Sequence, residues 1–306
     1  MAQPVKQSVY IDKALTNISI AYRNANYIWD QVFPTVRVDK ESGKYWIFTQ
    51  GDWFRDEAVI RAPGDEAPKS GFTLSTSSYN CVEYAIATDI ADRVLDNAEA
   101  ALRLRVSKTE FVTDKIHLKM ERQLASEIFT TGVWGTDNTS ATDWDDTTNS
   151  TPIEDVGTAI DTIALATGVE PNTLVLGREV WRALKQHPDI KDVIKYTQKA
   201  IPTPDLLAQI WDLDRILIGR AIYNTAAEGA TPSYSAIWGK NALVCYVAPN
   251  PGLMTPSAGY TFIARPFRVR RWRDDAKEAE IIEASIIADF VITGSALGYF
   301  FSGIVS

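Results

Sequence analysis

The chain has 306 residues, 45% of them hydrophobic, so it is long enough for one large domain or two ordinary ones and too apolar to be disordered throughout. Its formal net charge of −8 argues against a protein that binds nucleic acid through a broad basic face. The two cysteines lie far apart in the sequence and define no disulfide framework, which excludes a small disulfide-stapled fold.

Residues 1–43 are predicted to form an N-terminal arm. Their aromatic and aliphatic residues are scattered rather than arranged on one face, so the segment gains little by folding alone. It also lacks the apolar core of a secretory signal. We expect an arm that finds its apolar contacts elsewhere, and a packed N-terminal meander is the alternative.

Residues 44–79 are predicted to form a long β-hairpin. Side chains alternate over residues 45–50, and a second strand-like run precedes Tyr79. Between them, residues 51–71 are rich in glycine, proline and mixed charges, which is typical of an excursion with a polar tip. Loops of this length are usually functional. The candidate contact residues are Trp46, Trp53, Phe54, Arg55 and Lys69; a sugar-binding aromatic platform is the alternative.

Residues 104–131 are predicted to form one long helix, because they contain neither glycine nor proline and Gly132 follows. At ~1.5 Å per residue such a helix is about 40 Å long. Glu121 lies off its apolar face, so Glu121→Lys is expected to be mild. The predicted core stripe recurs every four residues and consists of Val112, Ile116, Met120, Leu124 and Ile128.

The second half of the chain alternates between loop, α/β and strand patterns. Residues 133–152 are polar and acidic and are predicted to be a surface loop. Residues 153–250 have an α/β pattern, in which a short apolar strand over 173–176 is followed by Gly177 and an amphipathic helix that ends before Pro188. Residues 251–306 read as strands, and their uncharged end is shorter than the ~20 residues that span a bilayer.

Catalytic and metal sites have little support in the sequence. His117 and His187 are the only histidines, and no Gly-x-Ser-x-Gly motif is present, so a serine hydrolase has only generic support. Zinc needs three or four clustered ligands, and two histidines with two separated cysteines do not supply them. We therefore predict no enzyme activity, no metal and no cofactor. The acidic loop does not match a calcium-binding loop either, although it contains Asp137, Asp143, Asp145 and Asp146.

The segment 265–273 is the one stretch that is rich in arginine. Its arginines alternate with apolar residues, and acidic residues follow at once and cancel much of the charge. We predict a strand with ion pairs within or between subunits, and contact with DNA is the weaker alternative because the net charge opposes phosphate. The residues expected to form these pairs are Arg268, Arg270, Arg271 and Arg273.

Four segments, taken in order, resemble the major capsid proteins of tailed phages: residues 92–129, 172–196, 215–226 and 237–252. No one of them is a specific motif; the order and number of segments carry the resemblance. It implies the Hong Kong-type capsid fold, an α+β fold. Its expected parts are an N-terminal arm (1–43), an extended hairpin loop (44–79), a peripheral domain (80–152 and 251–306) with its spine helix (104–131), and an α/β axial domain (153–250).

The resemblance also implies a function. The chain would self-assemble through pentamer and hexamer capsomers into an icosahedral head that encloses double-stranded DNA without sequence-specific contacts. It would assemble in the host bacterial cytoplasm and reside in the virion, away from membranes. Expected partners are many copies of itself, a separate scaffolding protein, a portal and a decoration protein. The alternatives are a bacterial nanocompartment shell around protein cargo and, further away, a hydrolase or a carbohydrate-binding module.

Overall fold

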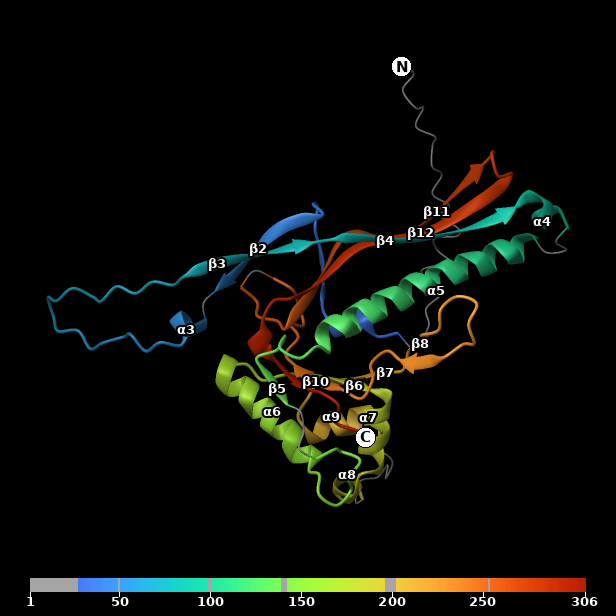
Figure 1. Cartoon of the computed structure of the whole chain (residues 1–306). Helices are drawn as coiled ribbons and strands as arrows, with labels where there is room; N and C mark the ends of the chain where they lie inside the picture. The colour runs from blue at the N-terminus through green and yellow to red at the C-terminus, as the bar shows by residue number, and fades with distance from the viewer. Residues whose placement is uncertain (1–26, 49, 98–100, 139–141, 196–201, 253) are drawn as a thin grey trace.

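The computed structural model of the chain describes residues 27–48, 50–97, 101–138, 142–195, 202–252 and 254–306 (Figure 1). Most of the predicted arm, residues 1–26, lies outside the described residues. The described part of the arm contains a short helix α2 (Trp29–Val32) and a strand β1 (Thr35–Arg37). Two sheets on either side of one long helix make up the body, and a hairpin extends far from it (Figure 1).

The first sheet has four strands in the order β1, β11 (Gly259–Asp274), β12 (Ala279–Ile292) and β4 (Val82–Ala91). β12 pairs antiparallel with both neighbours, while β1 runs parallel to β11. The register of β11 shifts on both sides of Arg265. Pro266 follows it and has no backbone N–H for the ladder, so an irregular pairing is expected there.

The long helix α5 (Ala101–Ile128) lies along this sheet (Figure 1). It begins and ends three residues earlier than the predicted span 104–131, and a short helix α4 (Asp92–Asn97) precedes it. Gly132 has a φ of 84°, a left-handed conformation that suits glycine. The five predicted stripe residues are all buried against the strands, with exposed fractions of 3% or less. This stripe therefore joins the helix to the sheet.

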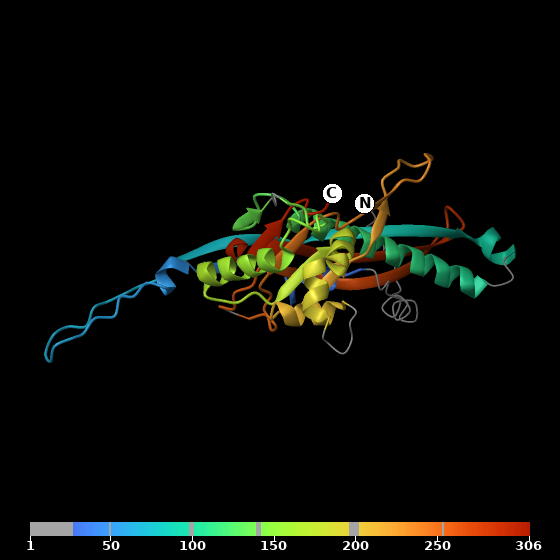
Figure 2. The same ribbon diagram turned by 90° about the horizontal axis from the view of Figure 1, so that it is seen from below.

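The second sheet has five strands, flanked by four helices. In order these strands are β5 (Thr136–Asn138), β13 (Gly298–Phe301), β10 (Ala242–Cys245), β6 (Thr173–Gly177) and β7 (Arg215–Gly219). The helices are α6 (Pro152–Thr167), α7 (Arg178–Gln186), α8 (Pro188–Ile194) and α9 (Pro204–Ile210). A hairpin of β8 (Ile222–Asn224) and β9 (Tyr234–Ala236) projects beside it, and Figure 2 shows this hairpin standing out from one face of a thin body.

The local sequence explains the α/β pattern. β6 is buried along its whole length, as expected for a strand with neighbours on both sides and helices over it. α7 buries Val180, Trp181 and Leu184 on one face and ends before Pro188, as the spacing predicts. Pro188 then opens α8, where a missing backbone N–H breaks no helical bond.

Two segments differ from their predicted places. β13 lies in the five-stranded sheet between β5 and β10, so the strands after residue 251 do not all complete the four-stranded sheet. The polar segment 133–152 is more than a surface loop, because it contributes β5 and fully buries Trp144. The Trp144 indole packs 5.3 Å from the Phe301 ring and donates to Asp155 at 2.8 Å. One buried tryptophan among many polar residues leaves no periodic signal.

The predicted hairpin is present as β2 (Ser42–Phe48) and β3 (Leu74–Asn80), which pair antiparallel over their whole length. A short helix α3 (Gln50–Trp53) follows β2. From Phe54 to Thr73 the chain contains no strand, so the ladder ends well before the tip.

Candidate assembly surface

The hairpin of residues 42–80 leaves the body as a narrow extension (Figures 1 and 2). Its base is firmly held by the four-stranded sheet. The rings of Tyr79 and Tyr45 stack on Phe262 at 4.7 and 6.0 Å, and the amide N–H of Asn80 donates to Asp289 at 2.8 Å. The direction of the hairpin is therefore set by packing at its base, while its outer part has no sheet beneath it.

The outer part exposes large apolar side chains. Trp46, Trp53 and Phe54 are 62%, 53% and 64% exposed, and Ile60 is fully exposed. Exposed apolar groups gathered on one element indicate an interaction surface better than single ones do. Other large apolar residues exposed on the same hairpin are Val59, Phe72 and Leu74.

The charged candidates on this hairpin pair locally. Arg55 lies 3.2 Å from Glu57, and Lys69 lies 2.7 Å from Glu66. Both pairs are well exposed, so they contribute little to subunit stability. The structure thus places all five predicted contact residues on one element but not in one patch, since Trp46 lies on β2 and the other four on the excursion.

One end of the excursion touches the second half of the chain. The Gln50 side chain donates to the carbonyl of Ala166 near the end of α6. The Phe54 ring lies so close to Gly168 that a Cβ there would be 2.9 Å from it. The backbone N–H of Thr73 donates to the side chain of Asp52 on α3 at 2.8 Å, so the two ends of the excursion are joined there. Within the subunit, then, only the near part of the excursion is anchored by these contacts.

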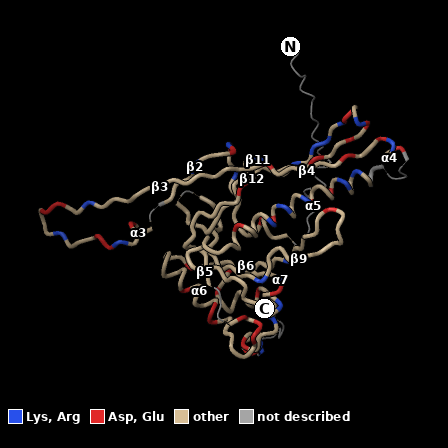
Figure 3. The backbone as a smooth tube through the Cα atoms, in the orientation of Figure 1, with Lys and Arg blue, Asp and Glu red and all other residues tan. Residues whose placement is uncertain are grey.

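The arginine-rich strand forms ion pairs within the subunit. Arg270 lies 2.6 Å from Glu283, Arg271 lies 3.2 Å from Glu280 and Arg273 lies 2.6 Å from Asp92. Arg268 is 3.8 Å from Glu83 and donates to Ser285 at 3.2 Å. These partners hold β11, β12 and β4 together, which supports the ion-pair interpretation over contact with DNA. Figure 3 shows acidic and basic residues mixed along the hairpin and α5 as well.

A serine, a histidine and an aspartate do meet in the structure, but with the wrong roles for hydrolysis. His187 Nδ1 accepts from the backbone N–H of Asp189 at 3.3 Å, so the ring proton belongs on Nε2, which faces Ser150 Oγ at 3.0 Å. Ser150 in turn donates to the carbonyl of Asp146 at 2.6 Å. A catalytic serine must instead give its proton to the imidazole. The buried His187 therefore caps α8, and the buried Ser150 ties the acidic segment to it.

The acidic segment has a structural role as well. Asp145 accepts from the hydroxyl of Ser306 at 2.5 Å, and this hydrogen bond lowers the pKa of the carboxyl. Among the described residues no three histidine, cysteine, aspartate or glutamate side chains gather in a way that could hold a metal ion. Within that same part of the chain, no helix has the length and apolar character needed to cross a membrane.

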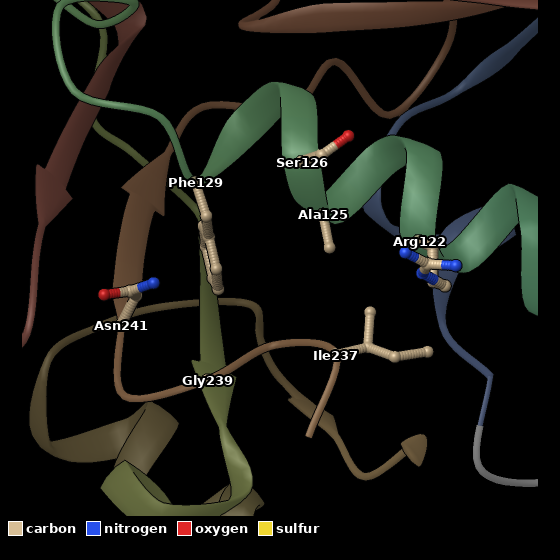
Figure 4. Close-up of a pocket in the computed structure, with 7 residues that line it drawn as sticks. All are labelled: Arg122, Ala125, Ser126, Phe129, Ile237, Gly239 and Asn241. Carbon is tan, nitrogen blue, oxygen red and sulfur yellow. The ribbon is translucent and has the colours of Figure 1, made fainter. Parts of the chain in front are cut away.

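A cavity of about 230 Å³ lies where α5 meets the loop before β10 (Figure 4). Ala125 and Ile237 face one another across it, and Arg122 lies at its edge. The Arg122 guanidinium sits 4.1 Å from the centre of the Tyr223 ring on β8. This cavity marks the junction between the helix of the first sheet and the strands of the second.

Sequence reasoning missed the most unusual residue at that junction. Glu121 is fully buried, although it lies off the predicted stripe and was expected to tolerate a lysine. It accepts hydrogen bonds from the backbone N–H groups of Ile28 and Trp29 and from the Trp238 indole. Those partners are about a hundred residues away in the chain, so no local pattern could reveal them. The premise of the prediction for Glu121→Lys, that this position lies off the buried face of the helix, is therefore wrong.

Comparison with known proteins finds relatives over nearly the whole chain. The family model described as phage major capsid protein E matches residues 135–215. The major capsid protein of Burkholderia phage BcepMu is 28% identical over 304 residues, covering 96% of both chains. The major capsid protein of Pseudomonas phage JBD67 is 28% identical over 242 residues, covering 77% of both. These named relatives are structural proteins and not enzymes.

Solved structures agree in fold. A phage-related protein of Bordetella bronchiseptica has a TM-score of 0.76 at 25% identity and covers 97% of this chain and 98% of its own. A virus-like particle from Pyrococcus furiosus has a TM-score of 0.60 at 11% identity, covering 94% and 98%. Microbacterium phage Oxtober96 gives 0.60 at 10% identity, covering 99% and 96%. These comparisons, with the architecture described above, show that the chain has the Hong Kong-type capsid fold and is similar over nearly its whole length to phage major capsid proteins.

Proposed function

We propose that this chain is the structural subunit of a phage head, and that many copies of it close into an icosahedral shell around double-stranded DNA. The observation that carries the proposal is the extended hairpin, which exposes tryptophan and phenylalanine in a chain whose full-length relatives are major capsid proteins. A subunit with no neighbours leaves this apolar surface in water.

The energetics favour contact with a neighbour. Burying one tryptophan removes roughly 150–250 Å² from water, a gross gain of about 4–6 kcal/mol at ~25 cal/mol per Å² before ordering costs. A few such anchors, repeated around a closed lattice, stabilise a shell from individually weak contacts. Assembly therefore needs no catalytic residue.

The domain map belongs to the same proposal. The four-stranded sheet with α5 would form the peripheral domain, and the five-stranded sheet with α6–α9 would form the axial domain at the centre of pentamers and hexamers. β13 and β5 would then belong to the axial domain. We further propose a separate scaffolding protein, a portal and a decoration protein as partners, with assembly in the host bacterial cytoplasm.

Electron microscopy of the purified chain, alone and co-expressed with its neighbouring genes, tests the proposal. We expect closed particles of uniform size. Subunits that stay monomeric in every condition would contradict it. The contents of the particles separate the second candidate: nuclease-protected DNA supports a phage head, whereas a single enriched protein supports a nanocompartment. A virus-like particle from Pyrococcus furiosus shares this fold, so the fold alone does not decide what the shell encloses.

A further inference from the structure

The five-stranded sheet has an acidic helix along one side. Helix α6 packs on β10 and β13, toward the side of the sheet that ends in β5. From residue 123 to residue 177 the sequence contains no lysine or arginine. Leu165 of α6 is 92% exposed. We term the exposed face of this helix the acidic edge; at helical spacing it carries Glu154, Thr158, Asp161 and Leu165.

The other side of the same sheet ends in β7 and is basic. The last residues of β6 and β7 are register partners, and an exposed arginine, Arg178 or Arg220, follows each of them. These two arginines therefore lie close together where the parallel strands end, and Arg182 follows one turn along α7. In the part of the chain that the structure describes, none of the three has a carboxylate partner. The nearby Asp212 and Asp214 precede β7 and so lie at its other end.

The β8–β9 hairpin adds an apolar surface on this side. Its antiparallel register places Ile222 and Tyr234 on one face, and both are exposed. Tyr223 lies on the other face, where the Arg122 guanidinium of α5 sits 4.1 Å from the centre of its ring. This contact with α5 sets which face of the hairpin is directed outward. We term the three arginines and this outward face the basic edge.

The two edges fit each other but not themselves. Two acidic edges repel, as two basic edges do, so contact between identical faces is disfavoured. The acidic edge of one copy against the basic edge of the next brings carboxylates to arginines and Leu165 to Ile222 and Tyr234. Since α6 and the β8–β9 hairpin lie on opposite sides of the sheet (Figure 1), this contact is head to tail. Head-to-tail contacts generate rings when the rotation closes.

Phosphate is the other chemistry that neighbouring arginines attract. A phosphate group gains nothing from the exposed Ile222 and Tyr234 beside them, and it leaves the acidic edge without a partner. A second copy of the chain satisfies both edges with one contact.

The extended hairpin leaves the body on the side of the acidic edge (Figure 1). Its Gln50 side chain donates to the carbonyl of Ala166, one residue beyond Leu165, and the Phe54 ring lies against Gly168. A neighbour that meets the acidic edge is therefore also within reach of the excursion of the hairpin.

We propose that copies of this chain join head to tail in a ring, with the acidic edge of each subunit against the basic edge of the next. This inference rests on the proposed function and names the contact between subunits of one capsomer. The opposite charges decide which edges meet, while exposed pairs of this kind contribute little net stability. The net negative charge of the whole chain therefore still sets how assembly responds to salt.

Charge reversal tests the pairing of the edges. Asp161→Lys and Arg220→Glu should each reduce the fraction of closed particles several-fold in sedimentation velocity, with unchanged melting because both positions are exposed. The double variant, which keeps the wild-type net charge, should recover most of that fraction. Asp161→Lys alone makes each chain less negative, so relief of general repulsion predicts the opposite result. Asp192→Lys makes the same charge change at an exposed position on α8, and this control should not reduce assembly.

Three outcomes of the reversal would overturn the proposal. One is that both single variants assemble like the wild type. Another is a double variant that assembles no better than the single ones. The third is Arg220→Glu particles that form normally but lose nuclease-protected DNA, which would assign the basic edge to phosphate.

Cross-linking tests the ring without requiring closed particles. Cys81 and Cys245 are buried, so thiols introduced at the surface react selectively. With a short bismaleimide, Leu165→Cys/Ile222→Cys should give a ladder from dimers up to a closed ring on a denaturing gel. Either single variant should stay monomeric. Leu165→Cys/Ser107→Cys, with the same number of thiols but one on the exposed face of α5, is the matched control and should give no ladder.

The two proposals fail in different ways. Closed particles from Leu165→Cys/Ile222→Cys that yield nothing above a dimer would refute the ring contact and leave the shell standing. A ladder from protein that never forms closed particles would support the ring contact and contradict the shell.

Discussion

Leu124 and Ile116 lie on the face of α5 that packs against the four-stranded sheet. Both are almost completely buried, at 0% and 3% exposure. We expect Leu124→Asp or Ile116→Asp to abolish soluble folding, because each places an unpaired charge in the main core. Leu124→Ala should cost about 2–5 kcal/mol of unfolding free energy.

Soluble yield and thermal melting by circular dichroism measure this effect. Ser107→Asp, at an exposed position on the same helix, is the matched control and should change little. Two aspartate variants that are soluble and melt like the wild type would mean that this face of the helix is not the one that packs.

Glu121→Lys should be as severe as those core changes. The lysine ammonium has no acceptor to offer, so it would leave the Ile28, Trp29 and Trp238 N–H groups unsatisfied. Each buried unsatisfied donor costs about 1–3 kcal/mol, against a typical total stability of 5–15 kcal/mol. Denaturant unfolding of Glu121→Lys beside Glu154→Lys measures the loss. Equal midpoints for the two variants would contradict the buried role of Glu121.

At the scale of single residues, the sequence predicted the burial of some side chains and not of others. The four-residue recurrence from Val112 to Ile128 predicted which side chains of α5 are buried, because helical spacing is a local property. The burial of Glu121 and Trp144 depends on partners from distant segments and on closure of the sheets. A pattern within one helix or loop contains no information about such partners.

At the scale of elements, local patterns predicted the hairpin, α5, β6 and α7, and long-range pairing decided the rest. β13 and β5 are short strands on one side of a sheet in which their neighbours β10 and β6 come from residues 173–245. Nothing in the uncharged end of the chain distinguishes pairing with β10 from pairing with β12. The arginine strand was expected to form ion pairs, but whether its partners lay in the same subunit required the register of β11, β12 and β4.

The excursion of the hairpin is expected to serve assembly rather than folding. Deleting residues 53–69 and bridging with Gly-Ser should leave a subunit that folds, because the base is held by Tyr45, Tyr79 and Asn80 and lies outside the deletion. The variant should lose most of its closed particles, since the exposed Trp53, Phe54, Val59 and Ile60 are removed. Circular dichroism melting and sedimentation velocity, run side by side, separate the two effects.

Trp53→Ala and Phe54→Ala should act in the same direction but more weakly. Phe54 also contacts Gly168, so its variant should loosen the tie to α6 as well. A deletion variant that melts normally and builds full-size particles would show that the excursion makes no essential contact with neighbours. One that does not fold would assign it to the core of the subunit.

At the scale of the whole molecule, assembly brings together subunits that repel one another. Each chain carries a formal charge of −8, and a closed shell multiplies that charge over a confined surface. The ion pairs of the arginine strand lie within the subunit, so they do not offset repulsion between subunits. Apolar anchors such as Trp53 are largely insensitive to screening, whereas the repulsion falls with salt.

We therefore expect the fraction of closed particles to rise as salt is increased from about 0.05 M to 0.5 M, over which the screening length falls from roughly 14 Å to 4 Å. Sedimentation velocity at fixed protein concentration measures this fraction. Sodium chloride is the suitable salt, because strongly excluded salts such as sulfate also strengthen apolar burial. The deletion of residues 53–69 should stay unassembled throughout, which shows that screening alone does not build the shell. If particles instead dissociate with added salt, attraction between charges on neighbouring subunits holds the lattice, and the apolar hairpin is not its main contact.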